Sequence, residues 1–238
     1  MLTGIVSMKA QNQFEVLVFS QYDQYHKESI PDGMEAFRKL AAEHVFGLTW
    51  TMDPSVFKEE SLNEYAVVVF FNAKADFLVE EEKEGLKQFI NNGGGFVGIH
   101  AASTTDGSWP WYNQLVGRIF TDHPREQSGI LEVKDRDFPA VISLPEKWIW
   151  TDEWYNFGEA QSEHLVDVLV VDESSYDTTR GYGDPIEGMG EHHPVAWYQE
   201  FDGGRSFYSA LGHKPEAYHN ERHMEFLYGA IYWAARGE

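Results

Sequence analysis

The sequence predicts an α/β fold of the doubly wound type, in which helices cover both faces of a mostly parallel sheet and a peripheral antiparallel extension is attached. Short runs of apolar and β-branched residues at 14–20, 66–71 and 96–99 are typical of buried strands. Amphipathic stretches at 31–46 and 80–92 separate these runs. Because strands and helices alternate closely, the crossovers should be right-handed and the strands parallel.

The first half of the chain carries clear helix boundaries. Pro31 suits a first helical turn, and apolar residues then recur at helical spacing up to about Phe46. Leu48 to Met52 is a short strand, and three glutamates at 80–82 place negative charge in the first turn of the next helix. That helix leads into the glycine-rich turn 93–95 and a short apolar run that ends at His100. In open α/β sheets ligands bind at the carboxyl ends of the strands, so His100 is the first candidate for chemistry.

The second half of the chain is less regular, and its predicted strands are short. The strands at 130–133, 142–144 and 148–150 are expected to be antiparallel and peripheral. The other predicted elements are a short helix ending near Gly117, a strand at 166–171, a long polar loop at 172–190, a hairpin of 195–200 and 206–211 around Asp202-Gly203-Gly204, and a last helix from about Glu221.

The totals suit one domain over residues 14–238, preceded by a flexible segment at 1–13, and they exclude several functions. The chain has 238 residues, of which 18 are basic and 39 are acidic. The resulting net charge of -21 disfavours binding to nucleic acid and to anionic lipid. It has no cysteine, so disulfides, thiolate metal sites and a cysteine nucleophile are excluded. No apolar run approaches the ~20 residues of a membrane span, and the start lacks signal-peptide regions, so a soluble, cytoplasmic protein is expected.

Two histidines are predicted to follow strands at the same edge of the sheet. His100 ends the glycine-rich strand, and His213 follows the last strand in much the same way. Such a pair could act as acid and base near neutral pH. The alternative is that each histidine only shapes its loop by hydrogen bonding to the backbone.

A metal site is a second interpretation of the histidines. His26, His123 and His193 fall in loops on the same predicted side, and Asp152 and Glu153 could add carboxylate ligands for a divalent transition metal. No pair has a recognised spacing such as H-E-x-x-H, so the sequence favours proton transfer over metal binding.

The stretch 151–155 places two adjacent carboxylates beside aromatic rings. In an extended segment neighbouring side chains point to opposite faces, so Asp152 and Glu153 cannot both face one pocket as a glycosidase pair. Glu153 is a candidate to orient or deprotonate a histidine. Most of the nearby aromatic residues are expected to pack in the core, although such rings can stack on sugars and the aromatic surface leaves a homo-oligomer open.

Six separated motifs together resemble the ThuA-like, or trehalose-utilisation, family. They occur in order over nearly the whole chain and are Gly-Gly-Gly-Phe-Val-Gly-Ile-His-Ala-Ala at 93–102, Trp-Pro-Trp-Tyr at 109–112, Asp-His-Pro at 122–124, Thr-Asp-Glu-Trp-Tyr-Asn-Phe at 151–157, His-His-Pro-Val-Ala-Trp at 192–197 and Gly-Gly-Arg-Ser-Phe-Tyr-Ser-Ala-Leu-Gly-His at 203–213. The resemblance implies a flavodoxin-like fold similar to class I glutamine amidotransferases. In those enzymes a cysteine nucleophile occupies the position that corresponds to His100, and the segment 213–216 resembles their His-x-Pro-Glu motif. Without a thiolate, glutamine amidotransferase activity is excluded.

The resemblance implies an enzyme of carbohydrate catabolism, acting on a disaccharide or a keto-sugar by histidine-mediated acid/base chemistry. His100 and His213 are the predicted acid and base, and Glu153 the predicted orienting group. The alternatives are a metal-dependent sugar hydrolase or isomerase and a non-catalytic sugar-binding or regulatory protein. The residues predicted to line the substrate pocket are His26, Asn72, Trp111, His123, Asp152, His193 and Arg205.

Overall fold

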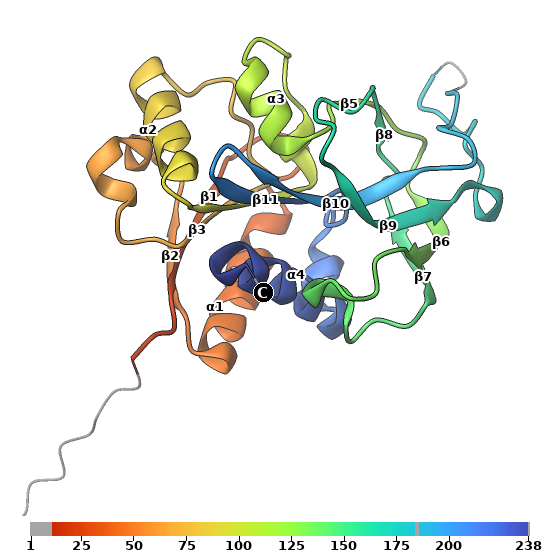
Figure 1. The fold of residues 1–238 in the computed structure, drawn as a ribbon. Coiled ribbons are helices and arrows are strands. Elements are labelled where there is room, and N and C mark those ends of the chain that lie inside the picture. The colour runs from red at the N-terminus through yellow and green to blue at the C-terminus, as the bar shows by residue number, and fades with distance from the viewer. Residues whose placement is uncertain (1–10, 184–185, 238) are drawn as a thin grey trace, which may run out of the picture.

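The computed structural model of the chain describes residues 11–183 and 186–237. Most of the segment predicted to be flexible, residues 1–10, lies outside the described residues. A nine-stranded sheet runs through the molecule in the strand order β2-β1-β3-β4-β11-β10-β9-β6-β7, with a separate two-stranded pair beside it (Figure 1).

Five neighbouring strands form the parallel half of the sheet. They are β2 (Gly47–Thr51), β1 (Glu15–Ser20), β3 (Val67–Phe71), β4 (Gly95–Ile99) and β11 (Gly204–Ser209). All residues of β3 and β4 are buried, as expected for parallel strands covered on both faces. The carboxyl ends of these strands therefore meet at one edge of the sheet.

The other four strands form the antiparallel extension. They are β10 (Pro194–Phe201), β9 (Val166–Asp172), β6 (Gln127–Val133) and β7 (Lys147–Asp152). β6 alternates buried and partly exposed residues, which is typical of a strand with one face on the core. The predicted antiparallel, peripheral position of the segments near 130 and 148 is confirmed.

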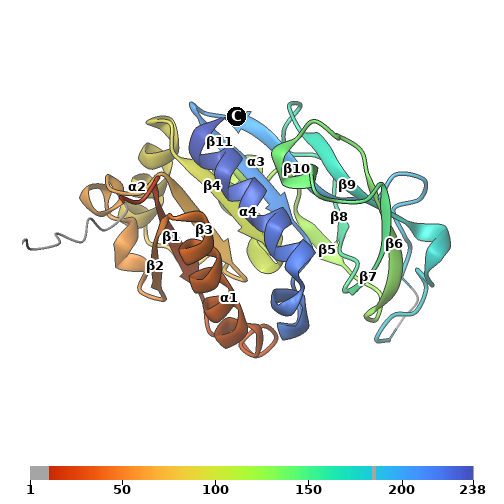
Figure 2. The same cartoon turned by 90° about the horizontal axis from the view of Figure 1, so that it is seen from below.

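Helices cover both faces of the sheet. Figure 2 shows α1 (Ser29–His44) and α4 (Glu221–Arg236) side by side across one face, while α2 (Glu80–Asn91) and α3 (Pro110–Val116) lie on the other. The residues at their ends have the preferences known for helix termini. Pro110 opens α3, the three glutamates at 80–82 fill the first turn of α2, and the αL residue Gly237 ends α4. The predicted doubly wound architecture is confirmed.

Two details of the second half differ from the prediction. Residues 142–144 are not a strand, because a 3₁₀ turn at Pro139–Val141 tucks this segment under α4 and buries Leu144. Gly229 of α4 permits that approach, since a Cβ atom there would lie 2.5 Å from the Cα atom of Ala140. The short strands β5 (Phe120–Asp122) and β8 (Asn156–Phe157), which pair with each other, were not predicted because so few residues show no periodicity.

No helix within 11–183 and 186–237 has the length and apolar character that crossing a bilayer requires.

Candidate functional site

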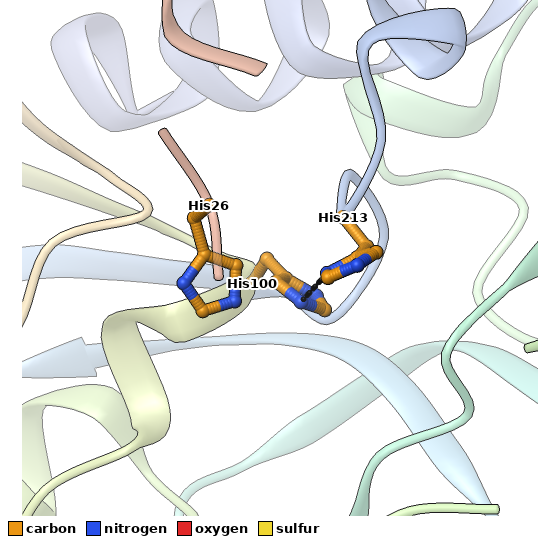
Figure 3. A group of neighbouring side chains, drawn as sticks. All are labelled: His26, His100 and His213. Atoms are coloured by element: carbon orange, nitrogen blue, oxygen red, sulfur yellow. Dashed lines mark hydrogen bonds between the residues drawn. The ribbon is translucent and has the colours of Figure 1, made fainter. Parts of the chain in front are cut away.

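A cluster of histidines lies at the carboxyl ends of the parallel strands. His26 follows β1, His100 follows β4 directly, and His213 follows β11, so that three segments far apart in the sequence meet (Figure 3). The centre of the His26 ring is 5.1 Å from that of His100 and 5.4 Å from that of His213. The sequence prediction that His100 and His213 come together is consistent with this placement.

His100 occupies a sharp turn between β4 and a short 3₁₀ segment. Its φ angle is 49°, a left-handed conformation that costs a non-glycine residue on the order of 1 kcal/mol. The turn is held by the hydroxyl of Tyr208, which donates to the His100 carbonyl at 2.8 Å. The imidazole is fully buried, and its Nδ1 atom lies 2.7 Å from the carbonyl oxygen of Ala210. Because a carbonyl can only accept, Nδ1 carries the hydrogen and Nε2 points its lone pair into the cluster.

His213 is held by a buried carboxylate. The backbone N–H groups of Gly212 and His213 donate to Asp152 at 2.9 and 3.3 Å, and Gly212 supplies the φ of 116° that the turn requires. The Nδ1 atom of His213 then lies 3.2 Å from Nε2 of His100. Burial raises the pKa of Asp152 to about 6, although the N–H donors around it oppose the shift. Asp152 therefore positions the turn that carries His213.

His26 is fixed by a carboxylate three residues earlier in the chain. Its Nδ1 atom lies 2.9 Å from Oδ2 of Asp23, and this leaves Nε2 available to the cluster. Burial raises the pKa of Asp23, but the hydrogen bonds from His26 and from the backbone of Tyr25 outweigh burial and lower it overall. Asp23 was not predicted from the sequence, although the Asp-x-x-His spacing after a strand is a signal that could have identified it.

Glu153 lies among three imidazole rings. Its Oε2 atom is 3.2 Å from Nδ1 of His213, 3.6 Å from Nε2 of His100 and 3.7 Å from Nε2 of His123. The Nδ1 atom of His123 is 2.9 Å from the carbonyl oxygen of Pro124, which leaves Nε2 as the nitrogen that faces Glu153. The side chains of Glu153 and His123 are 9% and 21% exposed, so this is the part of the cluster nearest to solvent.

The two central imidazoles, His100 and His213, are neutral near pH 7. Burial and the neighbouring His26 hold the pKa of His100 well below its usual value, and burial together with His100 lowers the pKa of His213 to about 3. A base with so low a pKa is weak at neutral pH. The cluster can therefore offer lone pairs and one carboxylate to a ligand, but little positive charge.

Asn72 and His193, two of the predicted pocket residues, form hydrogen bonds to the loops around the cluster. Asn72 follows β3 with a φ angle of 49°, and its amide donates to the hydroxyl of Ser29 at 2.9 Å and to the carbonyl of Gly212 at 3.4 Å. His193 is fully buried, with Nε2 2.8 Å from the carbonyl of Tyr155, whose ring packs 4.2 Å from that of His100. Both residues shape the loops that carry the cluster.

Two other predicted pocket residues lie elsewhere. Arg205 is at the start of β11, the end opposite to the histidines, and donates to the carbonyl of Ala234 at the last turn of α4. The indole of Trp111 donates to Asp202 in the β10–β11 turn at that same opposite end. Neither residue lines the histidine cluster, so the structure corrects both placements.

The described residues contain two groups that could hold a metal ion. One nitrogen from each of His26, His100 and His213 lies within 4.8 Å of the other two. The second group is Glu43, His44 and Glu225, between α1 and α4, and it is more exposed.

The comparisons with known proteins agree with this architecture. The ThuA family model, described as trehalose utilisation, matches residues 15–234. A ThuA-like protein from Bacteroides uniformis superposes with a TM-score of 0.82 at 23% identity, over 98% of this chain and 95% of that one. A second, from Parabacteroides merdae, gives 0.72 at 20% identity over 94% and 91%. A GMP synthase component from Thermoplasma acidophilum gives 0.57 at 10% identity over 93% and 94%, so the fold is that of class I glutamine amidotransferases.

No curated protein matches the chain. The family model covers nearly the whole sequence, and the motifs at 93–102 and 203–213 place the two central histidines within it. The chain belongs to the ThuA, or trehalose-utilisation, family.

Proposed function

We propose that the chain is an enzyme of carbohydrate catabolism that transfers a proton on a disaccharide or a keto-sugar. The substrate class is taken from the trehalose-utilisation family. The observation that carries the proposal is the position of Glu153, a buried carboxylate within 3.7 Å of three imidazole nitrogens at the carboxyl edge of the sheet. Carboxylates in such surroundings serve as general bases.

In this proposal Glu153 takes the proton, and the histidines position it. His100 has no exposed surface, so it acts through its neighbours, whereas Glu153 and His213 reach the accessible side. The C–H bond of the hydroxyl-bearing carbon next to the sugar carbonyl breaks, its electron pair forms a C=C bond while the carbonyl electrons move to oxygen to give an enediolate, and the proton passes to Glu153. Return of that proton to the former carbonyl carbon, with transfer of the hydroxyl proton from one oxygen to the other, would complete an isomerisation.

A groove formed by the sequence neighbours of Glu153 and His213 has a size that suits a carbohydrate. It has a volume of about 440 Å³, and its lining includes Trp150, Asp152, Lys214 and Asn220 but neither Glu153 nor a histidine of the cluster. A volume of this size falls in the range of small-molecule sites, roughly 300–1,000 Å³. An indole ring together with amide, ammonium and carboxylate groups suits a neutral, hydroxyl-rich ligand.

The test is deuterium exchange on the sugar. The full chain is incubated in D₂O with trehalose and with trehalose oxidised to a ring ketone, and NMR follows the loss of the C–H signal next to the carbonyl. We expect exchange with the ketone, and a rate at least about 100-fold lower for Glu153→Gln. Glu146→Gln is the matched control, because Glu146 is 80% exposed and precedes β7 at the end opposite to Asp152, so the change should leave the rate unchanged.

Two results contradict the proposal. One is equal exchange by the wild type and Glu153→Gln when both are folded by circular dichroism. The other is tight binding of a sugar without exchange or product, which supports a non-catalytic binding protein.

A further inference from the structure

We infer that His26, His100 and His213 form a binding site for one divalent transition-metal ion, with one imidazole nitrogen of each as a ligand. Figure 3 shows the three rings converging from three loops, and their ligand nitrogens lie within 4.8 Å of one another. The inference goes beyond the proposed function, because the ion would bind whatever sugar is the substrate.

The first argument is the orientation of the imidazoles. The Nδ1 atoms of His26, His100 and His123 are each within 2.9 Å of a carboxylate or a backbone carbonyl, groups that only accept. Each Nδ1 atom therefore carries a hydrogen, which leaves Nε2 as the nitrogen of each ring that can act as a ligand. Outer anchors of this kind, a carboxylate on one histidine and a carbonyl on another, are what fix metal-binding histidines.

The second argument is an imbalance between acceptors and donors. The Nε2 atoms of His26, His100 and His123 and the Oε2 atom of Glu153 all face the cluster. Within the described part of the chain, the side-chain nitrogen that could donate to them is Nδ1 of His213, which is 3.2 Å both from His100 and from Glu153. One hydrogen cannot satisfy four acceptors, and a cation would satisfy several at once.

The third argument is the spacing. Metal–nitrogen bonds of about 2.1 Å in a tetrahedral site place neighbouring ligand atoms about 3.4 Å apart. Nε2 of His100 and Nδ1 of His213 already meet this condition at 3.2 Å, and a shift of His26 on its loop by on the order of 1 Å would complete it. Binding of the ion would move the hydrogen of His213 from Nδ1 to Nε2, so that Nδ1 becomes a ligand. Three imidazoles favour a transition metal over magnesium or calcium, which prefer oxygen ligands. Asp23 and Glu153 supply two negative charges against the two positive charges of the ion.

The second group, Glu43, His44 and Glu225, lacks these features. The His44 ring stacks on Tyr228 with 3.5 Å between ring centres, and the carboxylates beside it are solvent-exposed or nearly so. It serves as an internal control.

The experiment is a titration of the full chain, purified without an affinity tag and stripped with a chelator. Co²⁺ is added while its visible absorption is followed, and Zn²⁺ is then used to displace it. We expect one equivalent of bound Co²⁺. His26→Gln and His213→Gln should each weaken binding at least about 100-fold, and Asp23→Asn about 10- to 100-fold. His44→Gln should bind like the wild type.

Several outcomes would overturn the inference. They are no binding below millimolar Co²⁺, binding that His26→Gln and His213→Gln leave unchanged, and binding that His44→Gln abolishes. Circular dichroism and urea unfolding confirm that each variant is folded. The two proposals fail separately: bound Co²⁺ without sugar exchange refutes only the proposed function, and sugar exchange without ion binding refutes only the metal site.

Discussion

His223 should make the protein lose stability as the pH falls, and the size of the loss can be worked out. The ring lies in α4, is fully buried against Trp150, and its Nε2 atom has no hydrogen-bond partner within the described residues. Burial lowers the pKa of His223 from 6.5 to about 3. The unfolded chain therefore takes up a proton below pH 6.5 that the folded chain refuses until about pH 3, so stability falls through this window.

One pKa unit corresponds to 1.36 kcal/mol, so the free energy of unfolding should fall by about 2 kcal/mol between pH 7 and pH 5. The perturbation is His223→Phe, which keeps a ring against Trp150 and removes the titrating group. Urea unfolding at pH 7 and pH 5 measures the free energy of both proteins. Other histidines also titrate, so the relevant quantity is the difference between the two pH effects. If the wild type and the variant lose the same free energy within about 0.5 kcal/mol, the reasoning is refuted.

Two further predictions concern packing and the opposite end of the sheet. Gly229→Ala should lower the free energy of unfolding by about 1 to 2 kcal/mol, because the new methyl group meets Ala140. Gly183→Ala is the control, since Gly183 has open space around it and its change should not destabilise the fold. Equal stability of the two variants in thermal or urea unfolding would contradict this prediction. Arg205→Met should lower the free energy of unfolding by about 1 to 2 kcal/mol, because Arg205 donates a hydrogen bond to the last turn of α4. The same change should leave the Co²⁺ affinity unchanged. A weakened affinity would place Arg205 in the metal site.

The sequence alone predicts the two central histidines, because each follows a strand that local patterns of glycine and apolar residues identify. A glycine-rich turn and a short apolar run identify the strand before His100, and the same pattern near the end identifies His213. Strand direction would also have excluded Arg205, because a residue at the start of a parallel strand lies at the edge opposite to one at its end.

The rest depends on contacts that no periodicity encodes. Glu153 reaches the histidines only because β7 and the residues after it fold back over the strand ends, and β7 pairs with β6 at the far edge of the sheet. The misassigned segment 142–144 has the composition of a strand, and only its packing under α4 decides its structure. The prediction that Asp152 and Glu153 point different ways is consistent with the structure, where one holds a backbone turn and the other faces imidazoles.

The spread of the site along the chain has a consequence for how it assembles. Asp23, His100, Glu153 and His213 belong to segments that contact one another only across the finished sheet, and contacts so distant in sequence form late in folding. A local opening of the antiparallel extension would withdraw Glu153 together with Asp152, which holds the His213 turn, while His26 and His100 stayed at the ends of the parallel strands. On heating, the reactive carboxylate and the anchor of His213 would then be lost together, before His26 and His100 separate.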